Sequence, residues 1–123
     1  MRLLTFILFL LPFSLFSQTV CSLESRDRLD AILVMLSEAD LSNKSIQELT
    51  LEIGQFFIGI PYVEKTLELP GEEKLVINLT GLDCTTYLET VVTLARVVKT
   101  RELTFATYEQ ELENLRYQDG ELK

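Results

Sequence analysis

Histidine is absent from the 123-residue sequence, and cysteine occurs only twice, at Cys21 and Cys84. Small secreted proteins that rely on disulfides carry about four or more cysteines, so the composition disfavours a disulfide scaffold. A bridge between Cys21 and Cys84 is an open possibility, but nothing in the sequence requires it. Without histidine there is also no recognisable zinc spacing. We therefore expect neither a metal ion nor a cofactor.

Basic residues are scarce as well. The chain has 11 Lys and Arg against 19 Asp and Glu, which gives a formal net charge of −8. Nucleic acids and anionic membrane surfaces attract basic proteins, so this balance disfavours both as partners. An acidic, solvated surface is sufficient to explain the charge.

The one long apolar run lies at the start of the chain, from Leu3 to Phe16, and follows the positive charge of Arg2. This run of about 14 residues is shorter than the roughly 20 that a membrane-spanning helix needs. The small residue Ser17 follows it at a suitable cleavage position. The pattern predicts a signal peptide over residues 1–17, a mature region over residues 18–123 and no stable membrane span after cleavage. We expect the mature protein in the periplasm or outside the cell.

Lipid attachment at Cys21 is an alternative use of this N-terminal segment. The three residues before Cys21 are Gln18, Thr19 and Val20, which supply neither the apolar nor the small residues expected before an acylated cysteine. A helical structural protein linked through Cys21 is therefore the weakest of the interpretations.

Helical periodicity dominates the mature region, whose roughly 105 residues are enough for one small domain. Apolar residues at helical spacing predict an amphipathic helix over residues 25–37. Ser45 and Glu48 form a capping box that predicts the start of a second helix, which Gly59 and Pro61 would end. A broad apolar face from Thr85 to Val98, which includes Tyr87 and Leu88, predicts a largely buried helix, and a last one follows Thr104.

One segment has the composition of a β-strand. The stretch EKLVINL at residues 73–79 is apolar and β-branched, and Thr80 and Gly81 end it. A single strand leaves backbone donors and acceptors unpaired inside a packed domain. We therefore expect an α+β fold whose sheet is incomplete within these residues.

Cys84 lies where the third predicted helix begins. Free backbone N–H groups and the positive end of the helix dipole both favour a thiolate at such a position, which is how a nucleophilic cysteine is prepared. The negative charge of Asp83 acts in the opposite direction, so Asp83 is expected to bind a substrate amine or to cap the helix. The alternative for Cys84 is a small buried hydrophobic residue.

Three blocks of the sequence resemble consecutive blocks of one family, namely GIPYVEKTLE at 59–68, EKLVINLTGLDCTTYLET at 73–90 and RYQDG at 116–120. They resemble the bacterial N-acetylmuramoyl-L-alanine amidase-like family, within the papain-like, NlpC-type superfamily of peptidoglycan cysteine peptidases. The likeness runs from roughly residue 46 to residue 120, and Asp-Cys-Thr-Thr is its most specific block. It implies the helical N-terminal part of a papain-like, NlpC-type α+β fold.

The resemblance also implies roles for individual residues. Cys84 would be the nucleophile that attacks an amide carbonyl of a peptidoglycan muropeptide. Asp83 would lie in the binding cleft, and Tyr62 would orient the substrate or hydrogen-bond a tetrahedral intermediate. An aromatic ring packed under a loop is the alternative for Tyr62. Thr85 and Glu89 are expected to have structural roles, Thr85 as a helix cap and Glu89 as a buried hydrogen-bonding residue.

The chain departs from the family in its lack of histidine, because a cysteine nucleophile of this kind needs an imidazole to take and return its proton. In the family a Ser-Arg-x-His segment follows the RYQDG-like block, so we expect the histidine and most of the β-sheet to lie beyond Lys123. As it stands, the chain is expected to be truncated and inactive. A small secreted binding module without catalysis, or a degenerate remnant, is the alternative.

Overall fold

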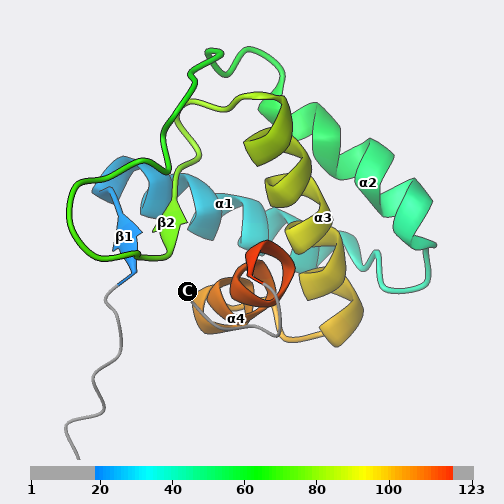
Figure 1. The fold of residues 1–123 in the computed structure, drawn as a ribbon. Helices are drawn as coiled ribbons and strands as arrows, with labels where there is room; N and C mark the ends of the chain where they lie inside the picture. The colour runs from blue at the N-terminus through cyan, green and yellow to red at the C-terminus, as the bar shows by residue number, and fades with distance from the viewer. Residues whose placement is uncertain (1–18, 118–123) are drawn as a thin grey trace, which may run out of the picture.

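A computed structural model describes residues 19–117, and the predicted signal peptide lies outside them. Four α-helices, one short 3-10 helix and two short strands occur in this range. Figure 1 shows α3 in the middle of the helical part, with α2 along one side, α4 below and α1 behind. The elements follow the chain in the order β1 Val20–Cys21, α1 Leu23–Ala39, α2 Ile46–Gly54, the 3-10 helix Gln55–Phe57, β2 Val76–Ile77, α3 Cys84–Thr100 and α4 Phe105–Arg116.

The first two helices begin at polar caps. At α1 the Ser22 side chain accepts a hydrogen bond from the Ser25 N–H, and the predicted apolar face of this helix is buried. At α2 the capping box of Ser45 and Glu48 is present, as the sequence predicted. The α-helix ends at Gly54, earlier than predicted, because the chain tightens there into the 3-10 helix.

The third helix supplies much of the core and contacts both α2 and α4. Most of its side chains between Thr90 and Val98 are buried, but Tyr87 and Leu88 in its first turns are 40% and 57% exposed. The predicted buried face is therefore wrong for this end of the helix. The physical reason is that the first turns of α3 extend past the core toward the loop that joins the 3-10 helix to β2 (Figure 1).

The predicted strand over residues 73–79 is present only at Val76–Ile77, and it is not alone. It pairs in parallel with β1, in the register Val20 to Val76. The ladder is short because β1 itself has only two residues. After Ile77, the Asn78 side chain accepts hydrogen bonds from the backbone N–H groups of Thr80 and Gly81 and turns the chain away.

Around β2, side chains of α1 and α4 form hydrogen bonds with backbone groups that further strands would bind in a wider sheet. The buried Ser25 hydroxyl of α1 accepts a hydrogen bond from the Leu79 N–H at 3.0 Å. On the other side, Arg116 Nη1 at the end of α4 donates to the Val76 carbonyl at 2.6 Å. These two bonds supply part of the pairing that the sequence predicted a larger sheet would provide.

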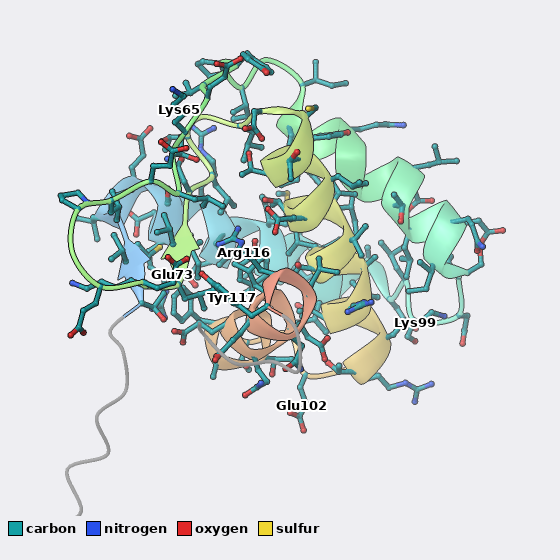
Figure 2. The ribbon with its side chains drawn as sticks, in the orientation of Figure 1. Lys65, Glu73, Lys99, Glu102, Arg116 and Tyr117 are labelled. Carbon is teal, nitrogen blue, oxygen red and sulfur yellow. The ribbon has the colours of Figure 1, made fainter. Side chains whose placement is uncertain are left out.

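Arg116 also joins α4 to α3. Its Nε donates to Glu89 Oε2 at 3.0 Å, and the two side chains are only 10% and 16% exposed. Glu89 is thus mostly buried and charge-paired, and its Oε1 is buried without a hydrogen-bond partner among the residues that the structure describes. Figure 2 shows Arg116 and Tyr117 beside β2, close to Glu73. Partial burial and the hydrogen bond from Tyr117 to Glu73 raise the pKa of Tyr117 to about 12.

The architecture is α+β, with a mostly helical body and a two-stranded parallel sheet at one side (Figure 1). Eighteen buried apolar side chains from all four helices and from the β2 region form one core cluster. None of the helices between residues 19 and 117 combines the length and the apolar composition needed to cross a membrane.

Candidate functional site

Cys84 is the first residue of α3, and Asp83 is its cap. Asp83 Oδ1 accepts hydrogen bonds from the Thr86 N–H at 2.8 Å and from the Thr86 hydroxyl at 2.9 Å. The Thr86 hydroxyl in turn accepts from the Asp83 N–H at 2.9 Å, which closes a capping box. Asp83 therefore caps the helix, and the partner is Thr86 rather than Thr85, the residue expected as a cap. These hydrogen bonds to the carboxylate lower the pKa of Asp83 below its ordinary value.

The lowered pKa of Asp83 predicts a stability loss in acid. A carboxylate whose pKa is lower in the folded state stabilises the fold above its ordinary pKa of 3.8, and this contribution is lost as the pH falls through the folded value. Asp83→Asn keeps a good helix cap but does not titrate. We expect the stability of the wild type to fall more steeply than that of the variant between pH 5 and pH 2, roughly the range around these pKa values. Urea unfolding followed by circular dichroism measures both slopes, and equal slopes would contradict the prediction.

Tyr62 reaches the start of α3 through a single β-bridge to Leu82. The Leu82 N–H donates to the Pro61 carbonyl at 3.1 Å, and the Val63 N–H donates to the Leu82 carbonyl at 3.2 Å. Gly81 allows this close approach, because a Cβ there would lie 2.6 Å from Cγ2 of Val63. The bridge places the GIPY segment directly beside Asp83 and Cys84.

The Tyr62 ring is 65% exposed, so the alternative of an aromatic ring packed under a loop is wrong. Its hydroxyl donates to Glu64 at 3.3 Å. Partial desolvation and the nearby Glu64 carboxylate raise the pKa of Tyr62, so the phenol is neutral at ordinary pH. A neutral phenol is a hydrogen-bond donor that can turn from Glu64 toward a ligand.

The three residues singled out in the sequence, Tyr62, Asp83 and Cys84, line one surface depression of about 270 Å³. The Cys84 thiol is free and exposed, so it is not the small buried residue of the alternative interpretation. Cys21 is also free, and no bridge joins the two. The rest of the lining is mostly apolar and comes from Phe57, Ile60, Leu82 and Tyr87.

These four lining residues were not predicted from the sequence as part of the site. For Tyr87 a signal was present, since it lies three residues after Cys84 and shares its side of the helix. For Phe57, Ile60 and Leu82 there was none, because the end of α2 and the Tyr62–Leu82 bridge bring them to the site.

A second, more polar depression of about 370 Å³ lies on the other side of Tyr62 and Asp83, which line both. Its wall includes Glu64, Glu68 and Lys65 from the loop that precedes β2, together with Thr85. Thr66 Oγ1 is buried in this wall and has no hydrogen-bond partner within the described part of the chain. The site therefore offers an apolar surface beside the thiol and a polar one past Asp83.

This arrangement suits nucleophilic chemistry at an exposed thiol. Cys84 lies at the start of a helix, where the helix dipole favours negative charge, although Asp83 already binds the Thr86 N–H of the first turn. The 123 residues contain no histidine to act as a general base. Between residues 19 and 117 there is no group of three or more acidic or cysteine side chains that could hold a metal ion.

The chain is similar to proteins of a known family. A family model described as AmiA-like, N-acetylmuramoyl-L-alanine amidase-like, matches residues 52–123. Two crystal structures of an N-acetylmuramoyl-L-alanine amidase from Bacteroides uniformis ATCC 8492, at 1.15 and 1.07 Å resolution, are similar in fold, with TM-scores of 0.58 and 0.57. The identities are 34% and 36%, over 62% of this chain.

The match covers only part of those relatives, because it spans 31% of the length of each solved amidase chain. No curated protein matches the sequence. The family model covers more than half of the chain and includes the whole segment from Tyr62 to Cys84. The resemblance seen in the sequence blocks is thus confirmed, and the chain belongs to the N-acetylmuramoyl-L-alanine amidase-like family.

Proposed function

We propose that this chain carries the nucleophile and part of the substrate cleft of a cysteine hydrolase that cuts an amide bond in peptidoglycan muropeptides. The observation that carries the proposal is the meeting of Cys84, Asp83 and Tyr62 in one exposed depression at the start of α3. The N-acetylmuramoyl-L-alanine amidase-like family and the amidase activity of the two solved relatives support the substrate class.

In the proposed reaction the Cys84 thiolate adds to the amide carbonyl carbon, and N–H groups at the start of α3 other than that of Thr86, which Asp83 binds, stabilise the negative oxygen. The tetrahedral intermediate then collapses. The carbon–nitrogen bond breaks, the leaving nitrogen takes up a proton, and a thioester remains on Cys84. Water hydrolyses the thioester, which releases the acid and restores the thiol.

Proton transfer is the step for which these 123 residues offer no imidazole. A base must take the thiol proton and return it to the leaving nitrogen. We therefore expect binding without efficient turnover by the 123-residue chain, and we assign the base to residues outside this sequence. The papain-like, NlpC-type assignment of the complete fold and a sheet that extends past Lys123 are part of the same proposal.

Asp83 and Tyr62 would position the substrate. Both line the apolar depression beside Cys84 and the polar depression next to it, so they stand where the two parts of a bound muropeptide would meet. Asp83 would accept from a substrate N–H, and the neutral Tyr62 phenol would donate to a substrate oxygen. Peptidoglycan lies outside the cytoplasmic membrane, which agrees with the signal peptide predicted over residues 1–17 and with a periplasmic or secreted location.

Chemical rescue tests this proposal. Muropeptides incubated with the 123-residue chain are expected to remain intact, and added imidazole, as an external base, is expected to start slow amide cleavage. Mass spectrometry detects the released product and a thioester on Cys84. Cys84→Ala should abolish the rescued cleavage, whereas Cys21→Ala, the matched control, should retain it. Rescued cleavage that is equal in the wild type and in Cys84→Ala would contradict a nucleophilic Cys84.

A non-catalytic binding module is the second candidate, and the absence of histidine is the observation that favours it. Calorimetry with muropeptides separates the two candidates. Binding that Tyr62→Ala weakens, without any imidazole-dependent cleavage, would favour the binding module. Binding accompanied by cleavage that depends on Cys84 would favour the hydrolase.

A further inference from the structure

Tyr87 stands between two depressions on the surface. One is the depression of about 270 Å³ beside Cys84, and the other is a groove of about 380 Å³ between α2 and α3. Tyr87 lines both of them. The lining of the groove is largely apolar and includes Leu51, Ile58 and Leu88, which are 73%, 81% and 57% exposed. The Tyr87 ring is therefore the partition that separates the Cys84 depression from a larger apolar surface.

Specific contacts hold this ring in place although it is 40% exposed. Its hydroxyl donates to the Gly54 carbonyl at the end of α2, at 3.2 Å. Its ring meets the Phe57 ring edge-to-face, with centroids 6.2 Å apart and an angle of 86° between the planes. Both partners belong to the segment where α2 passes into the 3-10 helix. The ring position is thus set by the end of α2 and the 3-10 helix that follows it, and not by burial.

Gly54 makes this contact possible. A Cβ at this position would lie 2.6 Å from the Tyr87 hydroxyl oxygen, closer than real Cβ contacts. The residue is buried, and its helical backbone does not itself demand glycine. The absence of a side chain at Gly54 therefore leaves room for the Tyr87 hydroxyl.

We propose that Tyr87 determines substrate specificity by limiting the size of the apolar group that binds beside Cys84. This inference rests on the proposed function of Cys84 as the nucleophile. Sites for whole drug-sized ligands enclose roughly 300 to 1,000 Å³, so the smaller depression at Cys84 accommodates one small uncharged group flanking the scissile amide. With Tyr87 truncated, the depression would join the groove between α2 and α3 and admit a larger apolar group.

Thiol labelling tests the partition directly, because Cys84 lies three residues before Tyr87 on the same helix. The 123-residue chain with Cys21→Ala has Cys84 as its only thiol. Its rates of reaction with N-methylmaleimide and with the bulkier N-cyclohexylmaleimide are each divided by the rate of the same reagent with N-acetylcysteine. The ratio of the bulky to the small reagent then reports the space beside Cys84.

In Tyr87→Ala this ratio is expected to rise about tenfold, the lower end of what one misfitting group costs in an apolar pocket. Tyr87→Phe keeps the ring and should change the ratio little. Leu88→Ala, which enlarges the groove but leaves the partition, is the matched control and should also leave the ratio unchanged. An unchanged ratio in a folded Tyr87→Ala variant would overturn the proposal.

A second variant covers the case in which Tyr87→Ala fails to fold, as judged by circular dichroism. Gly54→Ala places a Cβ 2.6 Å from the Tyr87 hydroxyl oxygen, so the ring must move from its position between the two depressions and the ratio should differ from that of the wild type. An unchanged ratio in this folded variant would overturn the proposal as well. The labelling needs no turnover, which separates its failure from that of the proposed function. If the labelling ratio changes in the Tyr87→Ala variant but imidazole starts no cleavage of muropeptides, the hydrolase proposal is wrong. If imidazole starts cleavage but the labelling ratio stays constant, the proposed role of Tyr87 is wrong.

Discussion

Arg116→Met is expected to lower the free energy of unfolding by about 3–5 kcal/mol, the usual cost of removing one partner of a buried ion pair. The substitution leaves the Glu89 carboxylate without its cation and the Val76 carbonyl without the Arg116 N–H. One oxygen of Glu89 already lacks a hydrogen-bond partner within residues 19–117, so the variant would leave both oxygens of this carboxylate without the partners that the structure shows. Urea unfolding, followed by circular dichroism at neutral pH, measures the loss.

Two further variants show whether the loss comes from the stranded charge. The double variant Glu89→Leu with Arg116→Met should recover much of the stability, because an apolar pair of similar volume is often as stable as a buried ion pair. Arg28→Met breaks the exposed pair with Glu24, whose side chains are 38% and 71% exposed, and should cost less than about 1 kcal/mol. If Arg116→Met costs no more than Arg28→Met, the description of a buried pair is wrong.

Tyr108→Ala is expected to cost about 3–5 kcal/mol, the range for truncating a large aromatic side chain in a core. Tyr108 is 1% exposed and heads the fully buried side chains when these are ranked by residue volume. It lies on α4, in the core cluster that also contains Leu94 and Val97 of α3. The cavity left by alanine would therefore loosen the packing of α4 against the helix that carries Cys84.

Tyr108→Phe is the matched control for this cavity. It retains the ring and removes only the hydroxyl, so the expected loss is about 1 kcal/mol. Thermal unfolding of the three proteins gives the comparison. Equal losses for the alanine and phenylalanine variants would show that the hydroxyl, and not the filled volume, stabilises this contact.

Local signals made the helical part predictable from the sequence. Ser45 and Glu48 satisfy backbone donors within one turn, so their pattern predicted a helix start that the structure contains. The position of Cys84 at the beginning of a helix followed in the same way, from the apolar periodicity that starts after it. Such interactions join residues only a few positions apart, so they can be recognised from the spacing of residue types in the sequence.

The β-pairing and much of the cleft were not predictable, because they depend on contacts between distant segments. Val20–Cys21 is too short to show an alternating pattern, and its pairing with Val76–Ile77 depends on the packing of α1 beside β2. The approach of Tyr62 to Cys84 likewise depends on one bridge to Leu82. The resemblance to a family, and not the local pattern, pointed to Tyr62.

The parallel pairing of β1 with β2 has a consequence for the order of folding. Helix α3 contacts α2 and α4, the helices before and after it in the chain. In contrast, β1 meets β2 only after a loop that contains both α1 and α2 has closed. Closing such a loop costs chain entropy before any contact repays it. We therefore expect the helices around α3 to assemble early and the N-terminal strand to dock last, so that the amide of Val20 gains protection from hydrogen exchange later than those of α3.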